Sequence, residues 1–277
     1  MSMESKKAAP VGVFDSGVGG LTSVPYIMRM LPDERIIFFG DTARTPYGSK
    51  AAGTIRQFTE QIGSFMVEND VKMMVAACNT ISAVALDDLQ RKYPHIPMIG
   101  TIRPTAKVVA RDCRETDRIG IMATKATVRS ESYLKRIREK NPGMKHLYQI
   151  ACPAFVPLIE EGIIDHEIMD LTIRFYLDDF IEKHGIDTLV LACTHYPLIS
   201  GNLKRLYPGV KLISSSEEAA TALKIELERR DMLAGPGNDR ENIFYASDLS
   251  DNFLNMIRLL LGDDVERLNI RFKNLDL

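Results

Sequence analysis

Short, almost uninterrupted apolar runs alternate along the chain with longer stretches whose apolar residues recur every three or four positions. Such runs are typical of strands buried on both faces of a sheet, whereas the longer spacing is typical of helices that bury one face. The stretch Thr54–Asn69, for example, has its isoleucines and phenylalanines in the helical spacing. The alternation therefore predicts an α/β fold with mostly parallel sheets. Nine runs are expected to form strands: Val11–Phe14, Arg35–Gly40, Val71–Ala77, Met98–Ile102, Arg118–Ala123, His146–Ala151, Thr188–Ala192, Val210–Ile213 and Ile243–Ala246.

The order of these segments repeats weakly within the chain. VGVFDSG, VAACNT and MIGTI follow one another in the first half, and RIGIMAT, LVLACTH and VKLISSS do so in the second. An Ala-Cys pair falls at the corresponding strand end of each half. The repeat predicts two similar α/β domains, for which 277 residues are enough. No linker rich in Ser, Pro or Gly separates them, so the boundary near Arg103–Pro104 depends on the repeat alone.

Composition and charge exclude several classes of protein. The chain has 45% apolar and 26% charged residues, as globular proteins do. Its 35 basic and 37 acidic residues give a net charge of −2, which predicts no nucleic-acid or anionic-membrane partner. The sequence has neither the apolar core of a signal peptide nor a run of about 18 apolar residues that would span a membrane. Four cysteines in this length do not make a disulfide framework, so we expect free thiols in a cytoplasmic protein.

Polar motifs follow the predicted strands at their carboxyl ends, where open α/β sheets bind ligands. Asp15–Gly20 (DSGVGG) allows a tight turn before a helix start that can hold an anion. It matches neither GxGxxG nor the P-loop pattern, so a turn without a ligand is favoured over nucleotide binding. Asp41–Lys50 (DTARTPYGSK) is a loop of turn-forming residues, either a substrate lip or a plain connection.

Two cysteines end corresponding strands of the two halves, Cys78 in CNT and Cys193 in CTH. Each precedes a predicted helix, whose dipole favours a thiolate. Buried packing, a metal site of Cys-x-His plus a distant Cys, and a pair of bases across a cleft are the competing interpretations. The sequence lacks the CxxC pairs usual for zinc. Cys113 lies in a charged helical stretch that indicates a surface or packing role, and Cys152, at a strand end near the expected cleft, has no acid, base or histidine beside it.

Five motifs, FDSGVGGL, GDTARTPYG, VAACNT, CPAFVPLIEEG and LACTHYP, resemble in this order those of the glutamate racemases, which supply D-glutamate for peptidoglycan synthesis. The resemblance implies two flavodoxin- or Rossmann-like three-layer domains, related by a pseudo-twofold axis, with the active site in the cleft between them. It implies that residues 1–103 and 218–277 form the first domain and residues 104–217 the second. It further implies that L- and D-glutamate are the substrates, that neither cofactor nor metal is used, and that the protein is a homodimer.

The same resemblance assigns roles to individual residues. Cys78 would deprotonate D-glutamate and Cys193 L-glutamate, on opposite faces of the α-carbon. Asp15 corresponds to the carboxylate beside the first cysteine, and His195 with Glu160 to the acid/base partners of the second. The substrate-binding positions implied are Asp15, Ser16, Pro46, Tyr47, Gly48, Asn79, Thr80, Thr124, Thr194 and His195.

The chemistry of racemisation agrees with this set of residues. An α-proton is very weakly acidic, and the sequence offers no recognisable context for a Schiff-base lysine. Stabilisation must then come from fixed hydrogen-bond donors around the substrate carboxylate in a water-poor cleft. One thiol must be ionised while the other is protonated, which a cysteine pKa of about 8.5 allows with modest adjustment.

Three positions depart from the usual family pattern. Ala126 in ATKAT and Ala192 in LACTHYP stand where glycine is commoner, and alanine at 126 would strain a turn that needs a positive φ. Arg103 in TIRPT stands near the domain junction, where it is expected to contact the substrate carboxylate or the other domain. Relatives that act on aspartate, hydantoins or malonates share the two cysteines, but the PYG and CTHYP motifs favour glutamate. A small-anion-binding module that uses DSGVGG without catalysis is the alternative of a different class.

Overall fold

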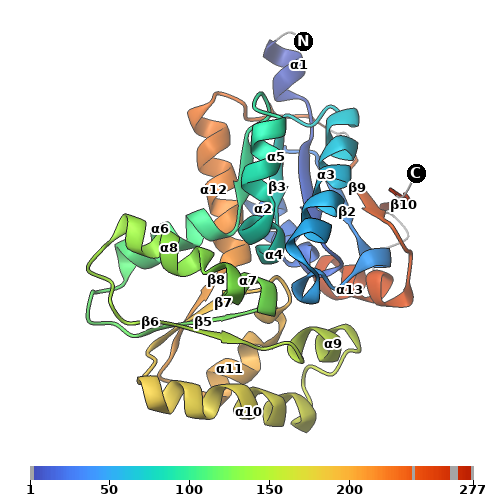
Figure 1. Ribbon diagram of the computed structural model, residues 1–277. Coiled ribbons are helices and arrows are strands. Elements are labelled where there is room, and N and C mark those ends of the chain that lie inside the picture. Colours follow the sequence, from blue (N-terminus) through green and yellow to red (C-terminus); the bar gives the residue numbers. More distant parts are fainter. Residues whose placement is uncertain (1–2, 239–240, 263–267, 276–277) are drawn as a thin grey trace.

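The protein contains two parallel sheets, each flanked by helices, in a computed structural model that describes residues 3–238, 241–262 and 268–275 (Figure 1). The larger sheet has the strand order β10-β9-β2-β1-β3-β4 and the smaller one the order β6-β5-β7-β8. All strand pairings within the described ranges are parallel. The predicted α/β class with parallel sheets is therefore confirmed. We call the larger sheet with the helices around it the first lobe and the smaller sheet with its helices the second lobe.

Each of the nine predicted runs contains a strand. The strands are β1 (Val11–Asp15), β2 (Ile36–Gly40), β3 (Met73–Ala76), β4 (Met98–Gly100), β5 (Ile119–Ala123), β6 (Leu147–Ala151), β7 (Thr188–Ala192), β8 (Lys211–Ser214), β9 (Ile243–Ala246) and β10 (Asn269–Phe272). Only β10 was not predicted, because its residues are half-buried or exposed at the sheet edge and form no apolar run. The central strands β1, β2, β3, β5 and β7 are buried throughout, which explains their unbroken apolar character.

The helices occupy the connections between the strands. They are α1 (Met3–Lys7), α2 (Val24–Met30), α3 (Ala52–Glu68), α4 (Asn79–Val84), α5 (Leu86–Lys92), α6 (Ile102–Asp112), α7 (Lys125–Ser130), α8 (Ser132–Lys140), α9 (Phe155–Glu160), α10 (Glu167–His184), α11 (Ser200–Leu206), α12 (Ser215–Arg229) and α13 (Asp251–Leu261). Short 3₁₀ helices are η1 (Gly19–Ser23), η2 (Thr42–Arg44), η3 (Tyr47–Ser49) and η4 (Tyr196–Ile199). The predicted helix Thr54–Asn69 corresponds to α3.

The core lies on both faces of the sheets. Along β1, Val11 and Val13 pack in one buried cluster, and Phe14 packs in the cluster on the opposite face. Fully burying a side chain of this size stabilises the fold by about 1.5–3 kcal/mol. A Cβ on Gly12 would lie 2.8 Å from the sulfur of Met66, so α3 approaches β1 closely only because this position is glycine.

The strand order places the ends of β1, β3, β5 and β7 where a ligand is expected. The order β2-β1-β3-β4 in the first lobe corresponds to β6-β5-β7-β8 in the second, and the repeated sequence segments fall on corresponding strands. In each lobe the second strand along the chain pairs with one side of the first strand, and the third strand pairs with its other side. The carboxyl ends of β1 and β3, and those of β5 and β7, therefore flank the points where the strand order reverses.

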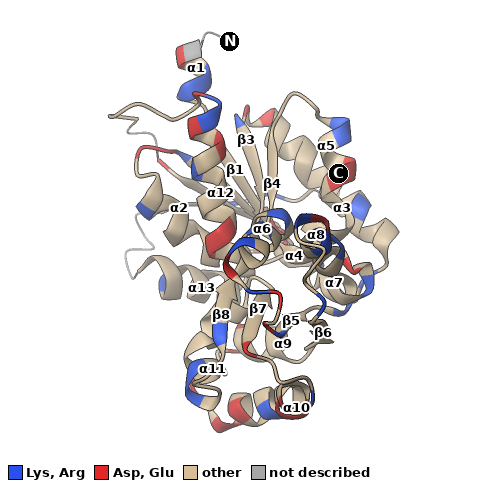
Figure 2. Cartoon of the chain, turned by 90° about the vertical axis from the view of Figure 1, so that its left-hand side faces the viewer, with Lys and Arg blue, Asp and Glu red and all other residues tan. Residues whose placement is uncertain are grey.

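Charged residues are spread over the helices, with Lys and Arg interspersed among Asp and Glu in the view of Figure 2. This mixture agrees with the net charge of −2. Among the described residues, no helix is both long enough and apolar enough to cross a membrane.

Candidate functional site

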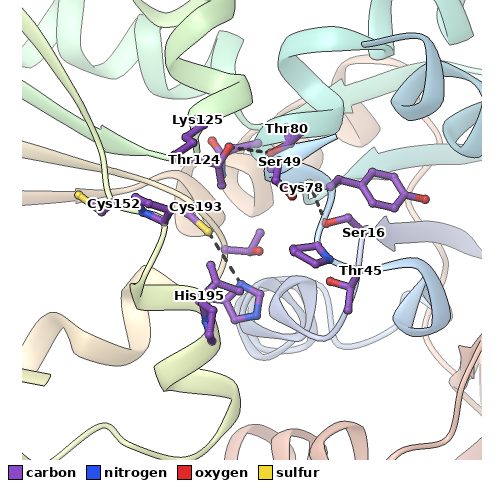
Figure 3. Close-up of a pocket in the computed structure, with 18 residues that line it drawn as sticks. Ser16, Thr45, Ser49, Cys78, Thr80, Thr124, Lys125, Cys152, Cys193 and His195 are labelled. Carbon is purple, nitrogen blue, oxygen red and sulfur yellow. Dashed lines mark hydrogen bonds between the residues drawn. The ribbon is translucent and has the colours of Figure 1, made fainter. Parts of the chain in front are cut away.

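A cavity of about 120 Å³ lies between the carboxyl ends of the two sheets and is lined by both lobes (Figure 3). This volume suits a small metabolite, since pockets for drug-sized ligands measure about 300–1,000 Å³. The lining residues are Ser16, Thr45, Pro46, Tyr47, Gly48, Ser49, Cys78, Asn79 and Thr80 of the first lobe and Thr124, Lys125, Cys152, Pro153, Val156, Pro157, Cys193, Thr194 and His195 of the second.

Cys78 follows β3 and is the N-cap residue of α4, with only 5% of its surface exposed. The hydroxyl oxygen of Ser16 lies 3.2 Å from its sulfur. Burial first, and then the negative charge of Asp15, raise the pKa of the Cys78 thiol to about 12. The thiol is therefore protonated at neutral pH and gives up its proton only when a neighbouring cation or base favours this.

Asp15, the last residue of β1, is completely buried behind this thiol. Its carboxylate accepts hydrogen bonds from the backbone N–H of Gly17 at 2.9 Å and from the hydroxyl of Thr194 at 3.4 Å. Burial raises the pKa of Asp15 to about 6, although the positive charge of His195 and these hydrogen bonds oppose the rise. Asp15 thus titrates close to neutrality, as a residue that relays protons should.

Cys193 follows β7 in the second lobe, and its sulfur lies 3.9 Å from Nδ1 of His195. The other ring nitrogen, Nε2, is 2.9 Å from Oε1 of Glu160 at the end of α9. Burial disfavours the charged imidazole, but the hydrogen bonds with Cys193 and Glu160 outweigh it and raise the pKa of His195 to about 10. His195 is therefore a cation at neutral pH.

The loop between β2 and α3 is held as a rigid wall of the cavity by the buried carboxylate of Asp41. Asp41 accepts hydrogen bonds from Arg44 Nε at 2.8 Å, from Ser247 Oγ at 2.8 Å and from the hydroxyl of Tyr47. Tyr47 is only 1% exposed and lines the cavity. A Cβ on Gly48 would lie 2.7 Å from Cβ of Thr124, so glycine is needed where the loop meets the second lobe.

Hydrogen bonds join the lobes on either side of the cavity. The hydroxyl oxygens of Thr80 and Thr124 are 2.9 Å apart. The hydroxyl of Thr22 donates to the backbone carbonyl of Thr194, also at 2.9 Å. These contacts fix the distance between the thiol-bearing strand ends.

Comparison with known proteins agrees with this geometry. The Asp/Glu/Hydantoin racemase family matches residues 26–223. A glutamate racemase of Geobacter metallireducens is 42% identical over 253 residues, which is 91% of this chain and 92% of that protein. One of Neisseria meningitidis is 42% identical over 261 residues, 94% of this chain and 96% of that protein. The chain belongs to the Asp/Glu/Hydantoin racemase family, among its glutamate racemases.

Solved structures of this family have the same fold. The glutamate racemase of Francisella tularensis, crystallised in complex with D-glutamate, matches with a TM-score of 0.89 and 36% identity, covering 98% of this chain and 99% of that one. An isoform from Bacillus anthracis matches with a TM-score of 0.90 and 32% identity, again covering 98% and 99%.

Most of the residues singled out from the sequence line the cavity: Ser16, Pro46, Tyr47, Gly48, Cys78, Asn79, Thr80, Thr124, Cys193, Thr194 and His195. Asp15 and Glu160 lie behind it, each hydrogen-bonded to a lining residue. Cys152 also lines the cavity, whereas Cys113 is buried at the C-cap of α6. Figure 3 shows Cys193 with His195 on one side of the cavity and Cys78 with Ser16 on the other. In the part of the chain that the structure describes, no three His, Cys, Asp or Glu residues are grouped to hold a metal ion.

Two expectations about the departures, strain at Ala126 and a contact of Arg103 with the substrate carboxylate, were wrong, and several lining residues were missed. Ala126 lies inside α7 and has no positive φ, because Thr124 caps this helix and no tight turn is formed. Arg103, at the start of α6, does not line the cavity; its guanidinium pairs at 2.8 Å with Asp87 of α5 on an exposed face. Lys125, Pro153, Val156 and Pro157 were not predicted. Thr45 and Ser49 were covered only by the interpretation of Asp41–Lys50 as a substrate lip and were not singled out as site residues.

Proposed function

We propose that the chain interconverts L- and D-glutamate by transferring the α-proton between two thiols, without a cofactor. The observation that carries this proposal is the pairing of Cys78 and Cys193, one from each lobe, at corresponding strand ends facing one cavity. Their surroundings differ, because burial and the charge of Asp15 raise the pKa of Cys78, whereas the sulfur of Cys193 lies 3.9 Å from the ring of His195. The product D-glutamate would supply peptidoglycan synthesis.

The reaction from L-glutamate begins with the Cys193 thiolate taking the α-proton. An S–H bond forms as the C–H bond breaks, and the electron pair passes into the substrate carboxylate. Cys78 then delivers its proton to the opposite face and becomes a thiolate, which the hydroxyl of Ser16, 3.2 Å away, stabilises. From D-glutamate the two cysteines exchange roles.

The intermediate carries negative charge on the α-carboxylate, so fixed donors must surround that group. The hydroxyl of Thr80 and one N–H of Asn79 are the donors we assign to the substrate carboxylates. Asp15, which lies behind the cavity, is assigned to relay the proton of Cys78, and Glu160 holds the charged form of His195. Tyr47 and Gly48, with Pro46, form the wall that selects the length of the substrate.

We also propose the domain division implied by the family. Residues 1–103 with 218–277 would form one domain and residues 104–217 the other, in pseudo-twofold relation. The corresponding strand orders support this, as does the return of the chain after β8 into α12, which packs against α2 and η1 of the first lobe. Limited proteolysis should then cut between the domains before it cuts within them.

We further propose that the protein is a homodimer and that it lies in the cytoplasm. A reducing compartment suits a mechanism that needs both thiols free. Helix α10 exposes Ile168, Leu171 and Phe175 on one face, with Phe175 81% exposed, and this stripe is the contact surface we assign. Sedimentation equilibrium should give twice the chain mass, and Phe175→Glu should shift it toward the monomer; a monomeric native protein would contradict the assignment.

The decisive test is incubation with either pure enantiomer of glutamate in D₂O. The circular dichroism of the amino acid should decay to zero while the α-proton signal disappears from the NMR spectrum. Cys78→Ala and Cys193→Ala should each abolish racemisation. Folded protein that exchanges no α-proton would overturn the proposal, and faster turnover of aspartate than of glutamate in a substrate panel would reassign the substrate.

A further inference from the structure

The side-chain amide of Asn79, which lines the cavity next to Cys78, is held by hydroxyls from three other segments. Its Oδ1 accepts from Thr101 Oγ1 at 2.9 Å and from Tyr133 Oη at 2.6 Å. Its Nδ2 donates to Ser215 Oγ at 3.0 Å. All three hydroxyl residues are completely buried. The amide is therefore fixed by the protein, not by solvent.

The direction of these hydrogen bonds follows from Ser215. Its hydroxyl proton goes to the backbone carbonyl of Leu191 at 2.8 Å, so its oxygen can only accept from Asn79. The NH₂ group of Asn79 must face Ser215, and its carbonyl oxygen must face Thr101 and Tyr133, which both donate. An amide has two N–H donors, so one remains for the cavity.

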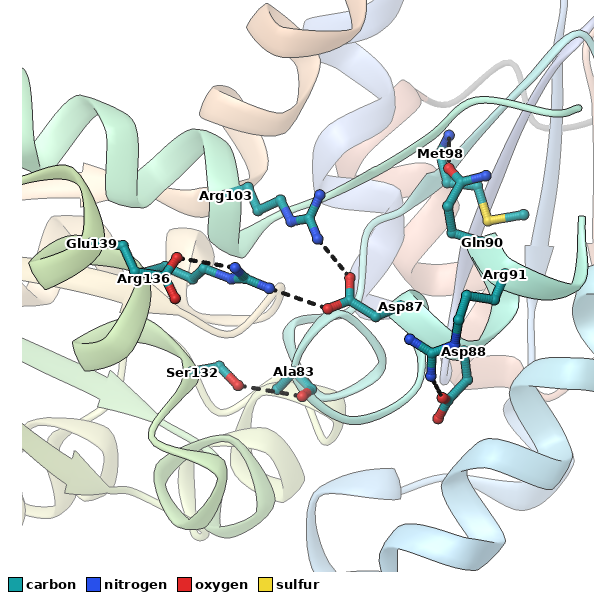
Figure 4. Close-up of polar contacts among 10 residues, drawn as sticks. All are labelled: Ala83, Asp87, Asp88, Gln90, Arg91, Met98, Arg103, Ser132, Arg136 and Glu139. Carbon is teal, nitrogen blue, oxygen red and sulfur yellow. Dashed lines mark hydrogen bonds and ion pairs between the residues drawn. The ribbon is translucent and has the colours of Figure 1, made fainter. Parts of the chain in front are cut away.

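The helix α8 that carries Tyr133 belongs to the second lobe and meets α4 and α5 of the first lobe along a seam. Ser132 Oγ donates to the carbonyl of Ala83 at 3.3 Å, and Arg136 pairs with Asp87 at 3.1 Å (Figure 4). The ion pair is 35% and 54% exposed, and solvent weakens such pairs. The buried hydrogen bond from Tyr133 to Asn79 is thus the contact in this seam that links the second lobe most directly to the cavity.

We propose that Tyr133 is a positioning residue for racemisation. From the second lobe, its hydroxyl sets the Asn79 amide so that the free N–H points at the substrate carboxylate, and it steadies the start of α4, where Cys78 is the N-cap. Tyr133 itself does not line the cavity, so it acts through Asn79. This inference rests on the proposed racemase function.

The test is Tyr133→Phe, which keeps the buried ring and removes only the donor. Thr101 still donates to the Asn79 oxygen, so the midpoint of thermal unfolding should fall by no more than about 5 °C. The Asn79 amide loses its hydrogen bond to the second lobe, and kcat should fall between about tenfold and 100-fold, with KM changed less than threefold. The effect falls on kcat because the alignment of the Asn79 N–H matters most for the charge that develops on the substrate carboxylate in the transition state. Kinetics are measured at a temperature where circular dichroism shows every variant to be folded.

Tyr207→Phe is the matched control. It also removes a phenol hydroxyl of the second lobe, which donates to Asp178 at 2.6 Å away from the cavity, and it should leave kcat unchanged. A double-mutant cycle then tests the route: in an Asn79→Ala background, Tyr133→Phe should cause no further loss of α-proton exchange.

The outcomes separate this inference from the proposed function. A native protein that does not racemise glutamate contradicts the function. An active native protein whose Tyr133→Phe variant retains its kcat, or loses the same factor in the Asn79→Ala background, overturns the positioning role alone.

Discussion

The glycine-rich turn after β1 determines how closely the first lobe approaches the histidine beside the second thiol. A Cβ on Gly19 would lie 2.4 Å from Nδ1 of His195 and 2.4 Å from Oγ1 of Thr194. Ordinary contact begins at 3.4 Å, so Gly19→Ala requires these side chains to move by about 1.0 Å, the difference between the two distances. No other residue type at position 19 removes this conflict.

The displaced histidine cannot keep both of its partners. His195 is 2.9 Å from Glu160 and 3.9 Å from the sulfur of Cys193, and a shift of about 1 Å lengthens at least one of these contacts beyond hydrogen-bond range. A misplacement of about 1 Å typically costs about 10²-fold in rate, which corresponds to about 2.7 kcal/mol. The same crowding should lower the free energy of unfolding by about 1–3 kcal/mol. We therefore expect a folded variant with about 100-fold lower kcat/KM.

The assay follows racemisation from both enantiomers. Because L- and D-glutamate have equal free energies, kcat/KM must fall by the same factor in both directions. Exchange of the α-proton of D-glutamate in D₂O should fall less than racemisation, because the Cys78 side is untouched. Gly53→Ala, in the first turn of α3, is the control: a Cβ there meets nothing within 4 Å, so activity should not change. Native kcat/KM in a folded Gly19→Ala variant would refute the role given to His195.

Three further predictions concern buried polar groups. Burial raises the pKa of Asp15 to about 6, so this carboxyl gains a proton and kcat/KM should fall as the pH drops through about 6. The raised pKa stabilises the fold by on the order of 3 kcal/mol while Asp15 is protonated, and this stabilisation is complete below about pH 4 and lost as the pH rises through 6. In urea unfolding, Asp15→Asn should abolish this pH dependence of the stability. Lys72→Met leaves Glu34 charged and buried without the partner that lies 2.6 Å away, and it should lower the free energy of unfolding by about 3–5 kcal/mol with kcat nearly unchanged. Thr80→Val removes the 2.9 Å contact with Thr124 and should lower kcat/KM by about tenfold in the racemisation assay.

Each of these has an outcome that contradicts it. Equal stability of the native protein and Asp15→Asn at every pH from 4 to 8 would show that the buried carboxylate does not titrate in this range. For the ion pair the control is Lys92→Met, which breaks the exposed pair with Glu60 and should leave the unfolding midpoint where it is; equal effects of the two variants would argue against a buried charge. Unchanged kcat/KM in Thr80→Val would mean that the contact between the lobes at this point is dispensable.

The strands were predictable because burial on both faces requires unbroken apolar runs, and these are visible in the sequence. β10 was not predicted because it pairs on one side only, at the sheet edge, where Arg271 and Phe272 are exposed and no apolar run is needed. The strain expected at Ala126 was wrong for a local reason. The hydroxyl of Thr124 accepts a hydrogen bond from the backbone N–H of Thr127, so the chain enters a helix where a turn was expected.

The cysteine pair was predictable because each thiol is next to a strand end in the sequence itself. The groups that fix the site were not, because their partners are distant in the chain. Asp41 receives a hydrogen bond from Ser247, 206 residues away, and Asn79 one from Tyr133, 54 residues away. Nothing in the spacing of either motif indicates such pairs: Asp41 and Ser247 meet only when the first lobe folds, and Asn79 and Tyr133 only when the two lobes are assembled.

The two lobes are alike in scaffold but carry opposite charges at the site, and the reaction requires this difference. Strand register aligns the end of β5 at Ala123 with Ala192, just before the second cysteine. The corresponding residue of β1, one beyond the paired Phe14, is Asp15. The first lobe thus places an acid where the second has alanine.

The converse holds two residues after each cysteine, where the second lobe has His195 and the first has Thr80. Racemisation has an equilibrium constant of one, yet at any moment one thiol must hold the proton that the other lacks. A perfectly repeated site would give the two thiols the same affinity for the proton. The acid lies beside Cys78 and the imidazole of His195 beside Cys193, so the two thiols have different surroundings before the substrate binds. Asp15 and His195 also attract each other across the lobes, which lowers the cost of burying both charges.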